Sequence, residues 1–222
     1  MVLNEIQKMK MALLVMNHAN VENAQKSYDF VMADSKESGT SSTPNEMADG
    51  IYLIKKVGSP VLFEPGCNKD ACIAVGIKMG SKSIALALKD AADGEYTTLT
   101  NSKDKTEYDG YIDNYTDAVA DWNGKSNTKH LEQIGLNKNI ILEDGQYIPA
   151  MGQMLFIFLN KKALNEALKY VGGQIIADAW YWTSTEDSAT DAWHLTLFDG
   201  TMGNGTKSTT TGRVRPVSAF IS

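Results

Sequence analysis

The chain has 222 residues, of which 43% are hydrophobic and 22% are charged, and its formal net charge is -6. This length fits one soluble globular domain of about 150 to 200 residues with an appendage. The negative balance argues against nucleic acid as a partner, and no apolar run approaches the roughly 18 residues of a membrane helix, so we expect no direct membrane insertion.

Residues 1–33 are predicted to form an N-terminal helix, because Ile6, Met9, Leu13 and Met16 recur at three- and four-residue intervals without an interrupting Gly or Pro. This apolar stripe packs either on its own domain or on copies of itself, which would make the chain a homo-oligomer. The same segment has no signal-peptide pattern, since Glu5 lies among the lysines of its start and it ends in Asn17, His18 and Asn20 rather than in small residues.

Residues 34–49 are rich in Ser, Thr, Gly and Glu, a composition typical of a flexible linker. The domain itself is predicted to occupy residues 50–222. Short apolar or alternating runs at 51–54, 72–77 and 83–88 are typical of core strands.

Helices are predicted in the middle of this domain, at 114–122, 126–134 and 150–159, and around Leu164 to Val171. Gly135 and the Gly172-Gly173 pair suit the positions at which such helices end. Helices between two β-rich ends favour the α+β class, with the N- and C-terminal strands paired in one sheet.

The cysteines, Cys67 and Cys72, are separated by four residues with no second pair or His nearby. This spacing is a poor zinc signature, so we expect no metal site and no cofactor. The sequence leaves open whether the two thiols form a local disulfide.

Near the C-terminus, strict alternation places Trp193, Leu195 and Leu197 on one strand face and His194, Thr196 and Phe198 on the other. The first face is expected to be core and the second to point outward. Asp199-Gly200 is a strong hairpin signal, and the closing strand at 213–220 is expected to be irregular or at an edge because it contains Pro216.

Trp180, Tyr181, Trp182 and Trp193 form an aromatic group that could stack on sugar rings. Aromatic side chains also dominate core packing, so we expect Trp182 and Trp193 to be core. Tyr181 is the member of the group that we expect to be exposed.

An ordered series of residues in the second half of the chain resembles a bacterial and phage group of C-type lectin-like domains. This group includes the variable proteins of diversity-generating retroelements and relatives at pilus tips. The upstream strands at 73–77 and 84–88 extend the resemblance to about residues 50–222. The series is Gly145, Tyr147-Ile148-Pro149-Ala150, Gly152-Gln153-Met154, Leu164-Asn165, Ala167-Leu168, Gly172-Gly173, Tyr181-Trp182-Thr183-Ser184-Thr185-Glu186, Ala192-Trp193, Gly200, Lys207 and Val214-Arg215-Pro216-Val217.

The resemblance implies a fixed scaffold that presents C-terminal side chains to a ligand. In the retroelement branch, adenine-directed mutagenesis of asparagine codons yields small, polar and some aromatic residues, but never Trp, Lys, Glu, Gln or Met. The predicted ligand-binding residues are Tyr181, Asp187, Ser188, Ala189, Thr190, Asp191, His194, Thr196, Phe198, Asp199, Thr201, Asn204, Thr206, Ser208, Thr209, Thr210 and Thr211. The predicted scaffold residues are Trp182, Trp193, Leu195, Leu197, Lys207, Val214 and Pro216, to which the codon argument adds Glu186 and Met202.

The chain departs from calcium-dependent lectins of this fold, because it lacks their Glu-Pro-Asn, Gln-Pro-Asp and Trp-Asn-Asp motifs. It also departs from formylglycine-generating enzymes, whose reactive cysteines lie near the C-terminal part of the domain, far from positions 67 and 72. We therefore expect a non-enzymatic protein that binds a protein or a cell-surface glycan, located on a cell surface or a virion. The alternatives are a structural tip or assembly subunit of a pilus or phage fibre and, third, an enzyme on the same scaffold.

Overall fold

The computed structural model describes residues 47–101 and 108–220. The predicted helix at 1–33 and most of the predicted linker lie outside these residues. In chain order the elements are β1 (Gly50–Lys55), β2 (Val61–Leu62), β3 (Cys72–Met79), β4 (Lys82–Ala87), the 3-10 turn η1 (Ala92–Gly94), α3 (Tyr115–Ala120), α4 (Gly124–Ile134), β5 (Gln146–Tyr147), α5 (Met151–Leu159), α6 (Lys161–Val171), β6 (Trp180–Glu186), β7 (Asp191–Thr196), β8 (Met202–Thr206) and β9 (Val217–Ser218).

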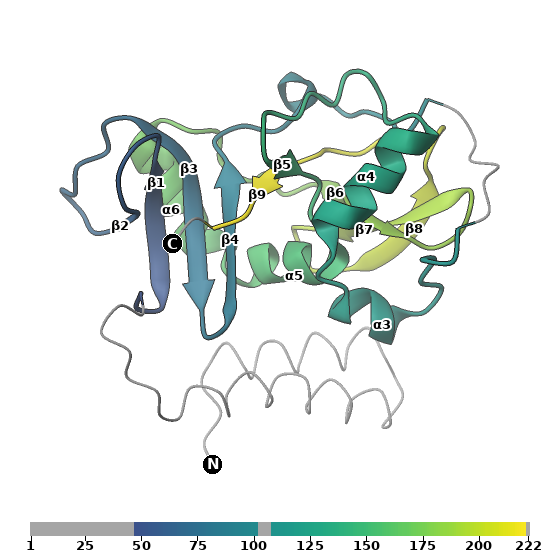
Figure 1. Cartoon of the computed structure of the whole chain (residues 1–222), viewed down its shortest axis with the longest axis horizontal. Coiled ribbons are helices and arrows are strands. Elements are labelled where there is room, and N and C mark those ends of the chain that lie inside the picture. The colour runs from purple at the N-terminus through teal and green to yellow at the C-terminus, as the bar shows by residue number, and fades with distance from the viewer. Residues whose placement is uncertain (1–46, 102–107, 221–222) are drawn as a thin grey trace, which may run out of the picture.

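Within the described residues the strands form two antiparallel sheets. The larger has the order β2-β1-β3-β4-β9-β5, and the smaller has the order β6-β7-β8. In Figure 1 the large sheet lies at the left and the small sheet at the right, with α5 between them. This arrangement confirms the predicted α+β class.

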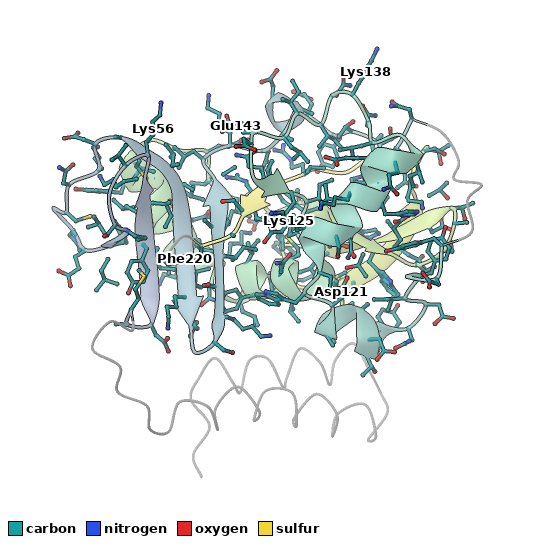
Figure 2. All side chains as sticks on the ribbon, viewed as in Figure 1. Lys56, Asp121, Lys125, Lys138, Glu143 and Phe220 are labelled. Atoms are coloured by element: carbon teal, nitrogen blue, oxygen red, sulfur yellow. The ribbon has the colours of Figure 1, made fainter. Side chains whose placement is uncertain are left out.

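Side-chain alternation gives the large sheet two different faces. Leu53, Val75 and Leu86 are cross-strand neighbours on the face that packs against the helices, and all three are fully buried. The opposite face carries small residues such as Gly76, over which the ring of Phe220 lies (Figure 2). The strands predicted at 51–54, 72–77 and 83–88 are confirmed.

The first and last strands belong to the same sheet but do not pair with each other, which corrects the predicted pairing of the termini. β9 pairs with β4 and β5, and both β3 and β4 lie between β9 and β1. β9 is short because Pro216, directly before it, has no N–H to continue the ladder.

The helices begin and end close to their predicted positions. Gly135 and Gly172, which follow α4 and α6, both adopt the left-handed conformation, with φ of 104° and 79°. α5 is buried from Met151 to Ile157, because it contacts both the small sheet and α6. It joins the two sheets into one core.

The last residues of the predicted linker contact the domain. Met47 packs against the cluster around Tyr52, and a carboxylate oxygen of Asp49 accepts a hydrogen bond from the Gly80 N–H at 2.8 Å. Cys67 and Cys72 are both free, half-buried thiols. No helix in the described part of the chain has the length and apolar character needed to cross a membrane.

Candidate binding surface

The small sheet has an inner face that belongs to the main core. Tyr181, Leu195 and Met202 are cross-strand neighbours on this face, and all three are buried. Trp193 lies on the same face, and its ring N–H donates to the Ile112 carbonyl at 2.7 Å. The predicted scaffold residues are all buried: Trp182, Trp193, Leu195, Leu197, Lys207, Val214 and Pro216.

The expectation that Tyr181 is exposed was wrong. Its side chain has 0% exposure, and its hydroxyl donates to Asp90 Oδ2 at 3.0 Å while accepting from the Ala177 N–H at 3.1 Å. Burial, reinforced by the Asp90 charge, raises the pKa of Tyr181 to about 12. Tyr181 is therefore a structural residue, and it lies on the inner face because it pairs with Leu195.

The outer face of the small sheet is only partly free, which corrects the simple inward and outward alternation. Trp182 pairs with His194 and lies on this outer face, yet it is fully buried. It packs with Leu99, Leu131 and Val214 in a second apolar cluster. His194 and Thr196, expected to point freely outward, are consequently half-buried.

A line of rings marks the uncovered part of this outer face. Tyr96, Trp180 and His194 follow one another, with ring centroids 6.4 Å apart for the first pair and 4.4 Å for the second. The guanidinium of Arg213 lies 5.3 Å from the centre of the Tyr96 ring. Tyr96 is 46% exposed, whereas Trp180 and His194 are half-buried. We call these four residues the aromatic row.

The remaining predicted ligand-binding residues have at least partly exposed side chains. Phe198 is 72% exposed and lies in the turn between β7 and β8, beyond the end of the strand that was predicted to carry it. The other exposed positions are Asp199, Thr201, Asn204, Thr209 and Thr211. The half-buried positions, besides His194 and Thr196, are Asp187, Ser188, Ala189, Thr190, Asp191, Thr206, Ser208 and Thr210.

Asp191 holds the loop at 187–190 in place by hydrogen bonds within the chain. Its carboxylate accepts from the hydroxyls of Thr190 at 2.7 Å, Thr206 at 2.8 Å and Ser188 at 3.3 Å. The hydrogen bond from Thr190 is the main reason that the pKa of Asp191 is lowered. By contrast, burial raises the pKa of the neighbouring Asp187. Asp191 thus orders the surface rather than offering a free carboxylate.

A buried ion pair fixes the base of this loop. Lys207 Nζ pairs with Glu186 Oε2, and each side chain is 1% exposed. The ammonium also donates to the Ser188 carbonyl at 3.2 Å, and His130 Nδ1 lies 2.5 Å from Glu186 Oε1. The His130 ring stacks on Tyr108. This network ties the loop to α4, and both ionic partners are residues that the codon argument assigns to the scaffold.

A second buried ion pair fixes the closing segment. Arg215 Nε donates to Asp90 Oδ1 at 2.6 Å, and both side chains are fully buried. The same guanidinium donates to the carbonyls of Ala87 and Gln174, each at 3.0 Å. Because Asp90 also binds Tyr181 and Arg213, this pair connects the inner face of the small sheet with the aromatic row.

The exposed groups of the small sheet and its loops are suited to noncovalent binding. They are ring atoms, hydroxyls and amides, and two buried ion pairs hold the backbone that carries them in place. Within residues 47–101 and 108–220, no group of three or more His, Cys, Asp or Glu side chains is placed to hold a metal ion.

Of the aromatic row, the predicted ligand-binding residues include only His194. Trp180 was named only as a member of the aromatic group, and Tyr96 and Arg213 were not candidates at all. Tyr96 lies in the loop after η1, 84 residues before Trp180 in sequence, and the segment around it carries no motif. Arg213 was assigned only to the closing strand. The fold brings Tyr96 and Arg213 to Trp180. Tyr181, which follows Trp180 in β6, forms a bridge with Arg213, and the Arg213 guanidinium lies over the Tyr96 ring.

The fold is similar to that of a fimbrial protein from Bacteroides ovatus, with a TM-score of 0.56 and 17% sequence identity. The match covers 77% of this chain and 48% of the fimbrial protein, so the chain spans about half the length of that structure. The sequence matches no protein-family model and no curated protein at a significant level. At this identity the similarity concerns the fold alone.

Proposed function

We propose that this chain is a recognition protein of a bacterial or phage surface, and that it binds a macromolecular ligand through the small sheet and its loops. The observation that carries the proposal is Phe198, a 72% exposed phenyl at the tip of a hairpin whose base is buried. An exposed aromatic side chain on a rigid support is a typical binding anchor. The fimbrial structure with a similar fold supports a surface-associated role.

The finer part of the proposal is that the domain is C-type lectin-like and belongs with the variable proteins of diversity-generating retroelements. The division of side chains supports it, because Glu186 and Lys207, which lie outside the codon-accessible set, are buried. Asn204, Thr209 and Thr211, which lie inside that set, are exposed.

The coding DNA provides a direct test of diversification. We expect a nearby near-copy of the segment that encodes residues 180–220, differing at template adenines, together with a reverse transcriptase gene. A genome without such a repeat would contradict diversification while leaving binding open to test.

Binding itself is tested with the fluorescently labelled full chain and a panel of intact bacterial and animal cells. We expect Phe198→Ser to weaken binding to the recognised cell type roughly tenfold or more, because an anchor side chain is lost. Val57→Ser is the matched control, since Val57 is 86% exposed but lies in the turn after β1. Equal binding by wild type and Phe198→Ser would contradict the proposal.

A structural tip or assembly subunit is the second candidate, favoured by the fold similarity to a fimbrial protein. In that case, substitutions at Phe198 and His194 would leave cell binding unchanged, and the full chain would associate with itself or with fibre subunits. Size-exclusion chromatography with light scattering on the full chain measures that association.

We propose no catalytic activity. Burial raises the pKa of Cys72, and this environment disfavours the thiolate that a cysteine nucleophile requires. Replacement of Cys67 and Cys72 by Ser should therefore leave cell binding intact, and loss of an enzymatic turnover on this replacement would contradict the proposal.

A further inference from the structure

The aromatic row contains unusual polar atoms in addition to its rings. Among the described residues, two buried side-chain nitrogen atoms lack a hydrogen-bond partner, His194 Nδ1 and Arg213 Nε. Buried polar atoms are normally paired, so each such exception calls for a physical explanation. Both belong to the aromatic row, in which His194 and Arg213 flank Trp180 and Tyr96.

Two glycines leave room for the Trp180 and His194 rings to lie against the backbone. A Cβ at Gly212 would lie 2.6 Å from the Trp180 ring, and a Cβ at Gly203 would lie 2.8 Å from the His194 ring. Both rings therefore rest directly on backbone, where any larger residue would displace them. The outer face of the small sheet is thus preorganised, and ordering it for a ligand costs little entropy.

We propose that the aromatic row is a saccharide-binding site, in which a pyranose ring stacks on one of the Tyr96 and Trp180 rings and contacts the other with its edge, since the two planes meet at 68°. The sugar hydroxyls form hydrogen bonds with His194 Nδ1 and Arg213 Nε. This inference rests on the proposed function and names the ligand class for one part of the surface. A sugar ring offers an apolar C–H face for stacking together with hydroxyls that both donate and accept. Because neither nitrogen atom is exposed, a sugar hydroxyl reaches it after a small side-chain rotation.

The surroundings favour a saccharide over other partners that stack on rings. A protein partner needs roughly 800 Å² on each side with an apolar centre, whereas the row consists of three rings and one guanidinium beside Thr196. Nucleic acid requires uncompensated positive charge, but Arg213 hydrogen-bonds to Asp90 at 3.3 Å and the chain carries a net charge of -6.

The test uses the full chain on slides that display neutral and acidic oligosaccharides, followed by titration calorimetry with the free oligosaccharide that binds best. We expect Tyr96→Ala and Trp180→Leu each to weaken the affinity roughly tenfold or more. Tyr96 is partly exposed, so Tyr96→Ala keeps the test valid even if Trp180→Leu does not fold. Ile141→Ala is the control, because Ile141 is a 75% exposed apolar side chain outside the small sheet and its loops.

The inference is overturned if no oligosaccharide binds, or if binding occurs but Tyr96→Ala and Ile141→Ala retain the same affinity as the wild type. Cell binding that depends on Phe198 but survives glycosidase treatment of the cells would also overturn it, and would leave the proposed function standing. Cell binding that is indifferent to Phe198 but lost with Tyr96→Ala would contradict Phe198 as the anchor and support the saccharide site.

Discussion

The two sheets are held together by different interactions. The large sheet is stabilised by aliphatic packing, in which Leu53, Val75 and Leu86 meet the helices on a continuous apolar face. The small sheet shares this core on one face, but its loops are fixed by the buried pairs Glu186–Lys207 and Asp90–Arg215.

The difference separates the support of the small sheet from its exposed surface. Apolar packing is non-directional and fills volume, whereas a buried ion pair fixes the position of particular backbone segments. Because both ion pairs lie beneath the surface, we expect the exposed side chains of the small sheet to contribute little to stability.

The largest expected effect is that of Lys207→Met, which leaves the carboxylate of Glu186 buried without its ammonium partner. Removal of one partner from a buried ion pair typically costs about 3 to 5 kcal/mol. Chemical denaturation should show a loss of this size in the free energy of unfolding. Lys138→Met is the control, since Lys138 extends away from the domain (Figure 2) and should change stability by less than about 0.5 kcal/mol.

The second effect is that of Tyr181→Phe, which removes the hydroxyl between Asp90 and the Ala177 N–H. A lost hydrogen bond to a buried charged group costs about 1 to 3 kcal/mol. Thermal or urea unfolding measures the change. If Tyr181→Phe instead left stability intact and weakened ligand binding, Tyr181 would be a ligand contact after all.

The sequence was sufficient for β1, β3 and β4 because these strands carry local apolar or alternating runs, and for the ends of α4 and α6 because both helices end at glycines. It did not give the strand order, because the pairing of β9 with β4 and β5 depends on contacts between distant segments. Local alternation placed Trp193 and Leu195 correctly. Trp182 was also placed correctly in the core. Tyr181 was not, because each face of the small sheet is covered by residues distant in sequence, including Leu99 and Leu131 on the face of Trp182. Alternation gives the relative sides of neighbouring residues, but it does not report that both sides are buried.

A smaller effect concerns pH. Burial lowers the pKa of His194 below its usual value of 6.5, so the folded state favours the neutral ring. The stability that this provides is present above about pH 6.5 and is lost as the pH falls toward the lower folded pKa. Hydrogen-exchange protection factors, corrected for the intrinsic rate at each pH, should therefore fall in β7 and β8 between pH 7 and pH 5, relative to those in β3 and β4. The change should shrink in a His194→Gln variant, and an unchanged pH response there would exclude His194 as its source.

The most direct test of the division between anchor and surface is the free energy of unfolding of one multiple variant, measured by urea denaturation. The variant combines substitutions at exposed positions only: Phe198→Ser, Thr201→Ala, Asn204→Ser, Thr209→Ala and Thr211→Ser. We expect its stability to remain within about 1 kcal/mol of the wild type, because exposed substitutions are individually small and nearly additive. A loss of about 3 kcal/mol or more, comparable to that of Lys207→Met, would show that the surface is part of the fold and would contradict the account.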